Sequence, residues 1–231
     1  MHVRRFGEGD RDLVLVLGWG NRFRHETVQW LVDQVVDEGY RVHGFQLPTV
    51  VTDFRSQWLD PVAEAVEPLD EYRLLTHSTG GLIGEFLDDP TWKVHLSPWW
   101  GFHERLDNPV VEYLSKLPVS TPILPSPAER EMLGELATDE RVADSPRAAA
   151  PTFLREARWA QHRLPPFDAD RTSVFYTPTD QVVSASAIEE RTPAENRVAY
   201  EGGHELFASP SRDIHLDAVL ASLADGPAAL R

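Results

Sequence analysis

Residues Leu74-Leu-Thr-His-Ser-Thr-Gly-Gly81 carry the strongest structural signal in this chain. The run from Arg73 to Thr76 predicts a short buried strand, and a helical pattern that continues through Leu87 begins just after Ser78. A strand that turns this abruptly into a helix holds the residue at the turn in a strained conformation, and it needs small neighbours such as Gly80. Ser78 is therefore expected at a strained turn, with its hydroxyl raised clear of the sheet.

On both sides of this stretch, short apolar runs alternate with helical repeats. Further strands are predicted over 13–17, 41–47, 93–96, 173–176 and 197–200, and further helices over 27–38 and about 56–67. Continuous apolar strands of this kind are typical of parallel sheets that are buried on both faces. The sequence therefore predicts an α/β fold with a mostly parallel central sheet and helices on both faces.

Residues 98–170 interrupt this alternation. Pro118, Pro122 and Pro125 break any long element, and the stretch opens with Trp99-Trp100-Gly-Phe102. About 70 residues are too many for a connection between two core strands. We expect a mostly helical insertion over 98–170, placed between the core segments 1–97 and 171–231.

Composition narrows the range of partners. The 231 residues include 37 Asp and Glu against 22 Lys and Arg, which gives a formal charge of −15. A field of this sign repels nucleic acid and anionic membranes, so neither is expected as a partner. With no cysteine, disulfides and thiolate chemistry are excluded.

The same composition suggests a cellular setting. Only Lys93 and Lys116 are lysines, and such an acidic, lysine-poor surface is typical of proteins from a salt-loaded cytoplasm. An ordinary acidic bacterial enzyme is the alternative. No targeting segment is recognisable, since the longest early apolar run, Leu13 to Leu17, is far shorter than a membrane span. A soluble, cytoplasmic chain is expected.

Two residues that follow predicted strands complete a catalytic pattern with Ser78. Asp180 follows the strand 173–176, and His204 follows the strand 197–200. A serine hydroxyl becomes a nucleophile when a base takes its proton and an acid orients that base. Taken singly, each has a structural explanation: a helix cap for Ser78, a turn for Asp180, packing for His204. Their joint order and placement predict a catalytic Ser78–His204–Asp180 set.

A serine nucleophile also needs backbone N–H groups that stabilise the negative charge of the intermediate. One is expected from Thr79, directly after the nucleophile. The second is expected from Trp19, in the loop Gly18-Trp19-Gly20-Asn21 that follows the first core strand.

With these residues in place, the chain resembles the α/β-hydrolase superfamily over its whole length apart from the insertion. Leu17-Gly-Trp-Gly20 resembles the oxyanion loop of small carboxylesterases, and His77-Ser-Thr-Gly-Gly81 resembles the nucleophile elbow. The resemblance implies that 98–170 forms a cap over the active site. The sequence departs from the family at two positions: Leu17 replaces a histidine that braces the oxyanion loop, and Thr76 replaces a glycine.

A serine nucleophile indicates acyl transfer, with an ester, thioester or lactone as the small-molecule substrate. Trp99, Trp100 and Phe102 are predicted to line an apolar substrate pocket. No metal and no cofactor is expected, and the sequence does not predict the oligomeric state. Two alternatives remain open: a non-catalytic protein that binds a small ligand on the same fold, and an acyltransferase or perhydrolase that uses the same three residues.

Overall fold

The computed structural model describes residues 1–126 and 128–231. Within them, seven strands form one sheet in the order β1-β3-β2-β4-β5-β8-β9. β1 pairs antiparallel with β3, and all other neighbours are parallel. The strands of this sheet are β1 (His2–Phe6), β2 (Arg11–Val16), β3 (Tyr40–Gln46), β4 (Tyr72–His77), β5 (Lys93–Leu96), β8 (Thr172–Tyr176) and β9 (Arg197–Ala199).

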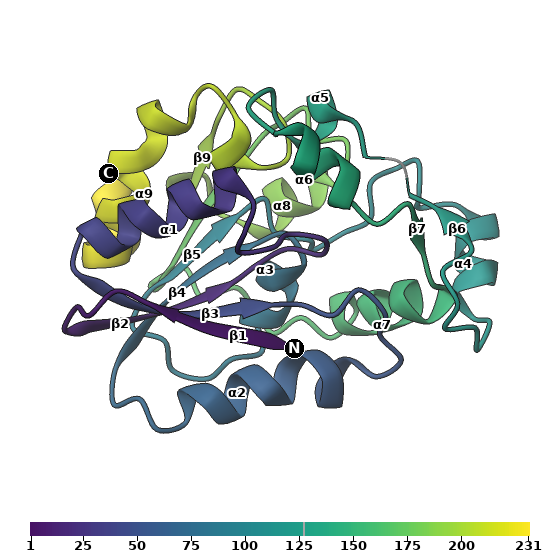
Figure 1. The fold of residues 1–231 in the computed structure, drawn as a ribbon, viewed down its shortest axis with the longest axis horizontal. Helices are drawn as coiled ribbons and strands as arrows, with labels where there is room; N and C mark the ends of the chain where they lie inside the picture. Colours follow the sequence, from purple (N-terminus) through teal and green to yellow (C-terminus); the bar gives the residue numbers. More distant parts are fainter. Residues whose placement is uncertain (127) are drawn as a thin grey trace.

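Helices cover both faces of the sheet (Figure 1). Within the described residues, none of these helices is long and apolar enough to cross a membrane. The α-helices are α1 (Glu26–Asp37), α2 (Asp60–Val66), α3 (Thr79–Gly84), α4 (Pro109–Ser115), α5 (Arg130–Leu133), α6 (Asp139–Asp144), α7 (Pro151–Gln161), α8 (Ala185–Arg191) and α9 (Arg212–Asp225).

The two faces of the sheet bury separate apolar clusters, as the apolar run from Leu13 to Leu17 requires. Leu13 and Leu15 face the cluster that contains residues of α1 and α9. Val14 and Val16 face the cluster that contains residues of α2, α3 and α7. Successive side chains of a strand point to opposite faces, so a segment buried on both sides is apolar at consecutive positions.

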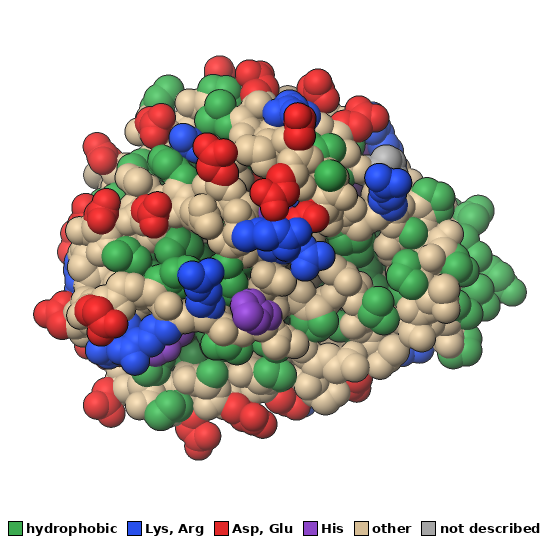
Figure 2. Space-filling view, in the orientation of Figure 1, with side chains coloured by type: hydrophobic (Ala, Val, Ile, Leu, Met, Phe, Trp, Pro, Cys, Tyr) green, Lys and Arg blue, Asp and Glu red, His purple; other side chains and the backbone are tan. Residues whose placement is uncertain are grey.

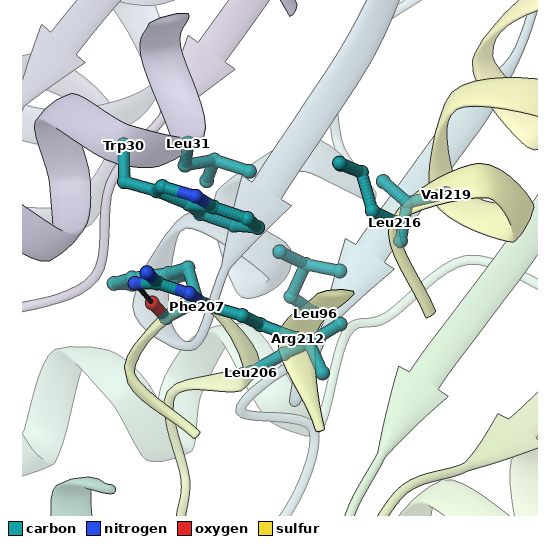
Figure 3. A pocket seen from close by; sticks show the side chains of 8 residues that line it. All are labelled: Trp30, Leu31, Leu96, Leu206, Phe207, Arg212, Leu216 and Val219. Carbon is teal, nitrogen blue, oxygen red and sulfur yellow. Dashed lines mark hydrogen bonds between the residues drawn. The ribbon is translucent and has the colours of Figure 1, made fainter. Parts of the chain in front are cut away.

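The meeting of α1 and α9 is visible in Figure 3. Trp30 of α1 and Val219 of α9 line a small apolar hollow over Leu96 of β5. The guanidinium of Arg212 lies 4.2 Å from the centre of the Trp30 ring and donates a hydrogen bond to the Phe207 carbonyl. Leu206 and Phe207, which follow His204 in the chain, also line the hollow. None of the predicted catalytic residues lines it.

The chain reverses its direction of travel across the sheet between β2 and β4. From β2 it passes to β3 on one side and then returns to β4 on the other. The carboxyl ends of β2 and β4 are therefore neighbours, and open α/β sheets bind ligands at this kind of position. As a result, the loop that follows β2 lies beside Ser78, which follows β4.

All the predicted strands and helices of the core are present, but the helix predicted to continue through Leu87 ends at Gly84, and α8 and α9 were not predicted. The predicted helix over 56–67 begins as a π-helical turn, Arg55–Leu59, and continues as α2. Pro61 has no N–H to donate to the carbonyl four residues earlier, and the amide of Asp60 instead bonds the Arg55 carbonyl five residues earlier. The edge strand β1 was not predicted, because its exposed side chains carry no apolar pattern.

Residues 98–170 form four of the α-helices, α4 to α7, together with a small antiparallel pair, β6 (Leu124–Pro125) and β7 (Ala148–Ala149). The pair was not predicted. α4, β6 and β7 lie at one end of the molecule, where hydrophobic side chains gather in Figure 2. α7 instead joins the main core: Phe153 is 2% exposed, and its ring lies 5.5 Å from that of Trp58 and 5.4 Å from that of Trp99.

A buried charged cluster lies beneath α3. Glu85 follows α3 and accepts hydrogen bonds from His95 and Arg191, with Lys93 4.0 Å away. Burial alone would raise the pKa of Glu85, but the bond from His95 and the charges of Lys93 and Arg191 outweigh burial and lower the pKa to about 2. Glu85 is therefore ionised, and the cluster anchors the end of α3 to the sheet and to α8.

We expect Phe153→Ala to lower the free energy of unfolding by about 3–5 kcal/mol, because it removes a ring from the interior of the core. Val110→Ala in α4 is the matched control, because Val110 is 66% exposed, and it should change the value by less than about 0.5 kcal/mol. Urea denaturation measures both. Equal effects of the two substitutions would show that α7 is not part of the core.

Glu85 should also make stability depend on pH. Its pKa is lower in the folded chain than in the unfolded one, so its stabilising effect is complete above about pH 4.5 and is lost as pH falls toward 2. The difference in unfolding free energy between wild type and Glu85→Gln should therefore be largest at neutral pH and shrink in acid. Urea denaturation across pH measures this difference, with exposed Glu64→Gln as the control. A difference that stays constant with pH would contradict this account.

Candidate active site

Ser78 lies at the turn between β4 and α3 with a backbone conformation that non-glycine residues rarely adopt, φ 52° and ψ −116°. The surrounding backbone holds it there. Its N–H donates to the Leu96 carbonyl at 3.0 Å, and its carbonyl accepts from the N–H groups of Gly81 at 2.9 Å and Trp99 at 3.0 Å. The strained turn expected from the sequence is therefore present.

Glycine at position 80 lets α3 approach the sheet closely enough for this turn. A Cβ atom at Gly80 would lie 2.1 Å from the carbonyl oxygen of Val16 in β2, a distance no side chain tolerates. Thr76 stands where the resemblance predicted glycine, and the glycines of α3 leave room for its side chain. A Cβ at Gly81 would lie 3.3 Å from its hydroxyl, and one at Gly84 would lie 3.0 Å from its methyl group.

Asp180 and His204 meet at the carboxyl ends of β8 and β9. The His204 Nδ1 lies 2.8 Å from the Asp180 Oδ2. The other carboxylate oxygen accepts the N–H groups of Val182 at 2.7 Å and Val183 at 3.0 Å, which fixes the orientation of the carboxylate. Because a carboxylate only accepts, the His204 Nδ1 donates this hydrogen bond, and in the neutral form of the ring the lone pair lies on Nε2.

The same histidine lies beside the serine turn. The ring of His204 is 4.8 Å from that of His77, the residue directly before Ser78. The Nε2 atom of His204 is buried and has no hydrogen-bond partner within residues 1–126 and 128–231. The structure thus places the three predicted residues at the same end of the sheet, with the His204 Nε2 atom on the side of the ring that makes no hydrogen bond within the described residues.

Tyr200 supports the His204 loop, a role that the sequence analysis missed. Its hydroxyl donates toward the carbonyls of Gly203 and His204 at 2.9 Å each and lies 2.9 Å from the hydroxyl of Ser97. Burial and the nearby Asp180 charge raise the pKa of Tyr200 well above its ordinary value, so the hydroxyl keeps its proton. The available signal was its position at the end of a predicted strand, immediately before the base loop.

The expected oxyanion loop is a tight turn beside Ser78. The Asn21 N–H donates to the Gly18 carbonyl at 3.1 Å, and Gly20 takes the positive φ of 85° that the turn requires. A Cβ at Gly18 would lie 3.0 Å from the Cβ of Ser78, so the loop passes directly over the serine. Trp19 lies inside this turn, and its N–H takes no part in the turn's own hydrogen bond.

Thr79, the source of the other expected N–H, follows Ser78 directly and begins α3. It is buried, with 1% of its surface exposed. The first N–H groups of a helix have no partner within the helix, which leaves this one available to a ligand.

A chain of buried polar side chains links the loops around Ser78, and the sequence analysis missed it. Arg141 of α6 donates to Glu205 from Nε at 3.0 Å and from Nη2 at 2.5 Å. The same Glu205 oxygen accepts the Asn21 amide at 2.9 Å, and the Asn21 carbonyl lies 3.0 Å from the His77 Nδ1. Asn21 and Glu205 adjoin residues with predicted roles, whereas nothing in the sequence marks Arg141.

The three aromatic residues predicted to line a pocket are all buried, in different surroundings. Trp99 stacks on Phe153, with 27° between the ring planes, and lies 5.0 Å from Phe102. The backbone of Trp99 bonds Ser78 directly. Trp100 donates its indole N–H to the Gly81 carbonyl and packs against His95, beneath α3. Within the described residues, no group of His, Cys, Asp or Glu side chains is arranged to hold a metal ion.

Comparison with known proteins yields matches in structure only. No protein-family model matches the sequence, and no curated protein matches it in sequence. A monoacylglycerol lipase from Paleococcus ferrophilus has a similar structure, with a TM-score of 0.75 and 17% identity over 97% of this chain and 98% of that one.

Two further solved structures are similar. A soluble variant of monoglyceride lipase from Saccharomyces cerevisiae has a TM-score of 0.74 and 12% identity over 97% of this chain and 90% of that one. An esterase from Exiguobacterium antarcticum has a TM-score of 0.68 and 14% identity over 97% of this chain and 95% of that one. Together with the sheet order, these similarities show that the chain has the α/β-hydrolase fold.

Proposed function

We propose that this chain is a serine hydrolase that cleaves a small-molecule ester, thioester or lactone through an acyl-enzyme on Ser78. The observation that carries the proposal is the pairing of His204 with Asp180, which leaves the His204 Nε2 free beside the strained Ser78 turn. A protein that only binds a ligand has no physical need for this arrangement. The lipases and the esterase of similar structure support the ester class of substrate.

The geometry supplies a role for each group. The Ser78 hydroxyl oxygen attacks the acyl carbon while the His204 Nε2 takes its proton, and Asp180 stabilises the resulting imidazolium. The negative charge that forms on the acyl oxygen is stabilised by the N–H groups of Trp19 and Thr79, each contributing about 3 kcal/mol. His204 then returns the proton to the leaving group, and water, activated in the same way, releases the acyl group from Ser78.

The surroundings of Ser78 suit an apolar acyl group. Trp99 bonds the Ser78 carbonyl through its backbone, and its ring stacks with Phe153, which also packs 4.6 Å from the ring of Trp19. We assign Trp99 and Phe102 to the acyl side of the substrate pocket and Trp100 to the support beneath it. Residues 98–170 contribute these aromatic rings, and we propose that the segment acts as the cap over the site.

We expect a fluorophosphonate probe to form one covalent adduct with the wild-type chain, because the probe reacts only with an activated serine. Ser78→Ala should form no adduct at this site, and His204→Ala should react more slowly by about three orders of magnitude or more. Intact-mass spectrometry measures the adduct. Exposed Ser56→Ala is the control and should react like the wild type.

Two results would contradict the proposal. An adduct that survives Ser78→Ala would mean that another serine is the nucleophile. A wild-type chain that is folded by circular dichroism and forms no adduct would favour the alternative of a non-catalytic ligand-binding protein. Hydrolase and acyltransferase activities share the labelling step, and the acceptor that competes with water distinguishes them.

We further propose that the chain works in a cytoplasm rich in salt. The formal charge is −15, and acidic side chains are scattered over much of the face in Figure 2. Their mutual repulsion weakens as salt screens it. The melting temperature should therefore rise between about 0.1 M and about 2 M KCl. Thermal unfolding followed by circular dichroism measures it, and an unchanged or falling melting temperature would favour an ordinary acidic bacterial protein.

A further inference from the structure

The buried chain Arg141–Glu205–Asn21–His77 connects four parts of the molecule. Arg141 belongs to α6, Glu205 follows His204, Asn21 closes the oxyanion turn, and His77 precedes Ser78. Arg141 is 3% exposed and Glu205 is fully buried. Buried polar groups are costly unless each finds a partner, so the bonds of this chain strongly restrict where the four segments lie.

The direction of every bond in the chain follows from its charged end. Arg141 only donates and the Glu205 carboxylate only accepts, so Asn21 must turn its NH₂ group to Glu205 and its carbonyl oxygen to His77. His77 must then carry its proton on Nδ1. Burial and the neighbouring His204 lower the pKa of His77 well below its ordinary value, so the ring stays neutral. The ring beside His204 therefore adds no positive charge that would oppose protonation of His204.

The His77–Asn21 bond also determines how closely the backbone of the Gly18–Asn21 turn approaches His77. A Cβ at Gly18 would lie 2.6 Å from the His77 Nδ1 and 2.8 Å from the Asn21 Oδ1. The loop backbone thus rests directly on this hydrogen bond. Trp19 is the next residue of this turn, so we infer that the position of its N–H relative to Ser78 depends on the same bond.

We propose that Asn21, Glu205 and Arg141 are positioning residues. They hold the Trp19 N–H at the position beside Ser78 where it can stabilise the acyl oxygen, and α6 thereby supplies a part of the active centre. This inference rests on the proposed hydrolase function. None of the three residues is assigned a contact with substrate. They act through the turn whose N–H stabilises charge in the transition state, so their loss should lower kcat and leave KM nearly unchanged.

The test replaces the buried ion pair with apolar side chains in the double variant Arg141→Met with Glu205→Leu. Such replacements often preserve stability, because both charges are removed together. With p-nitrophenyl acetate as the probe, we expect kcat to fall by about 10- to 100-fold, since small displacements of a catalytic group have effects of this size. The rate of labelling by the fluorophosphonate should fall in parallel.

The matched control removes another ion pair, at the opposite end of the sheet, where Arg41 and Asp12 lie 2.6 Å apart. Arg41→Met with Asp12→Leu should leave kcat unchanged. If the double variant at 141 and 205 does not fold, Asn21→Ala decides the question, because it breaks the chain and leaves the ion pair in place. It should show the same loss in kcat with KM unchanged.

The outcomes separate the two proposals. A folded variant that keeps the wild-type kcat would overturn the positioning role alone, because the enzyme would still be active. A loss confined to KM would also overturn it, since that would place the residues against the substrate. A wild-type chain that reacts with neither probe would overturn the hydrolase function and this inference with it.

Discussion

The close approach of α3 to β2 at Gly80 is the constraint on which the site depends. Backbone meets backbone there, because the carbonyl oxygen of Val16 occupies the space that a side chain at position 80 would need. This contact allows β4 to pass into α3 within one residue, and that passage places Ser78 in its strained conformation. The strain is maintained by the hydrogen bonds to Leu96, Gly81 and Trp99, which belong to three different segments.

The sheet order adds the remaining groups around this turn. The neighbouring carboxyl ends of β2 and β4 bring the Gly18–Asn21 turn over the serine, and the ends of β8 and β9 bring Asp180 to His204. Each loop is then fixed by buried polar side chains: Tyr200 for the His204 loop and Asn21 for the Gly18–Asn21 turn. The apolar clusters on the two faces stabilise the strands, and the buried polar side chains fix the loops at the carboxyl ends of the strands.

Sequence reasoning predicted most of the core, because its strands are buried on both faces and carry an unbroken apolar signal, as Leu13 to Leu17 does. It failed for β1, whose side chains are exposed, and for the short pair β6 and β7, whose strands have two residues each. For the site, it predicted residues that stand at strand ends. It missed Arg141, because a contact between α6 and Glu205 depends on how the insertion folds back, and no local pattern encodes that.

The covalent intermediate that we propose on Ser78 can be trapped with an acyl substrate. The wild-type chain would be mixed with p-nitrophenyl acetate, quenched in acid within the first turnovers, digested and mapped by mass spectrometry. We expect an acetyl group on the peptide that contains Ser78. Turnover of the ester with the acetyl group on another residue, or on none, would contradict it.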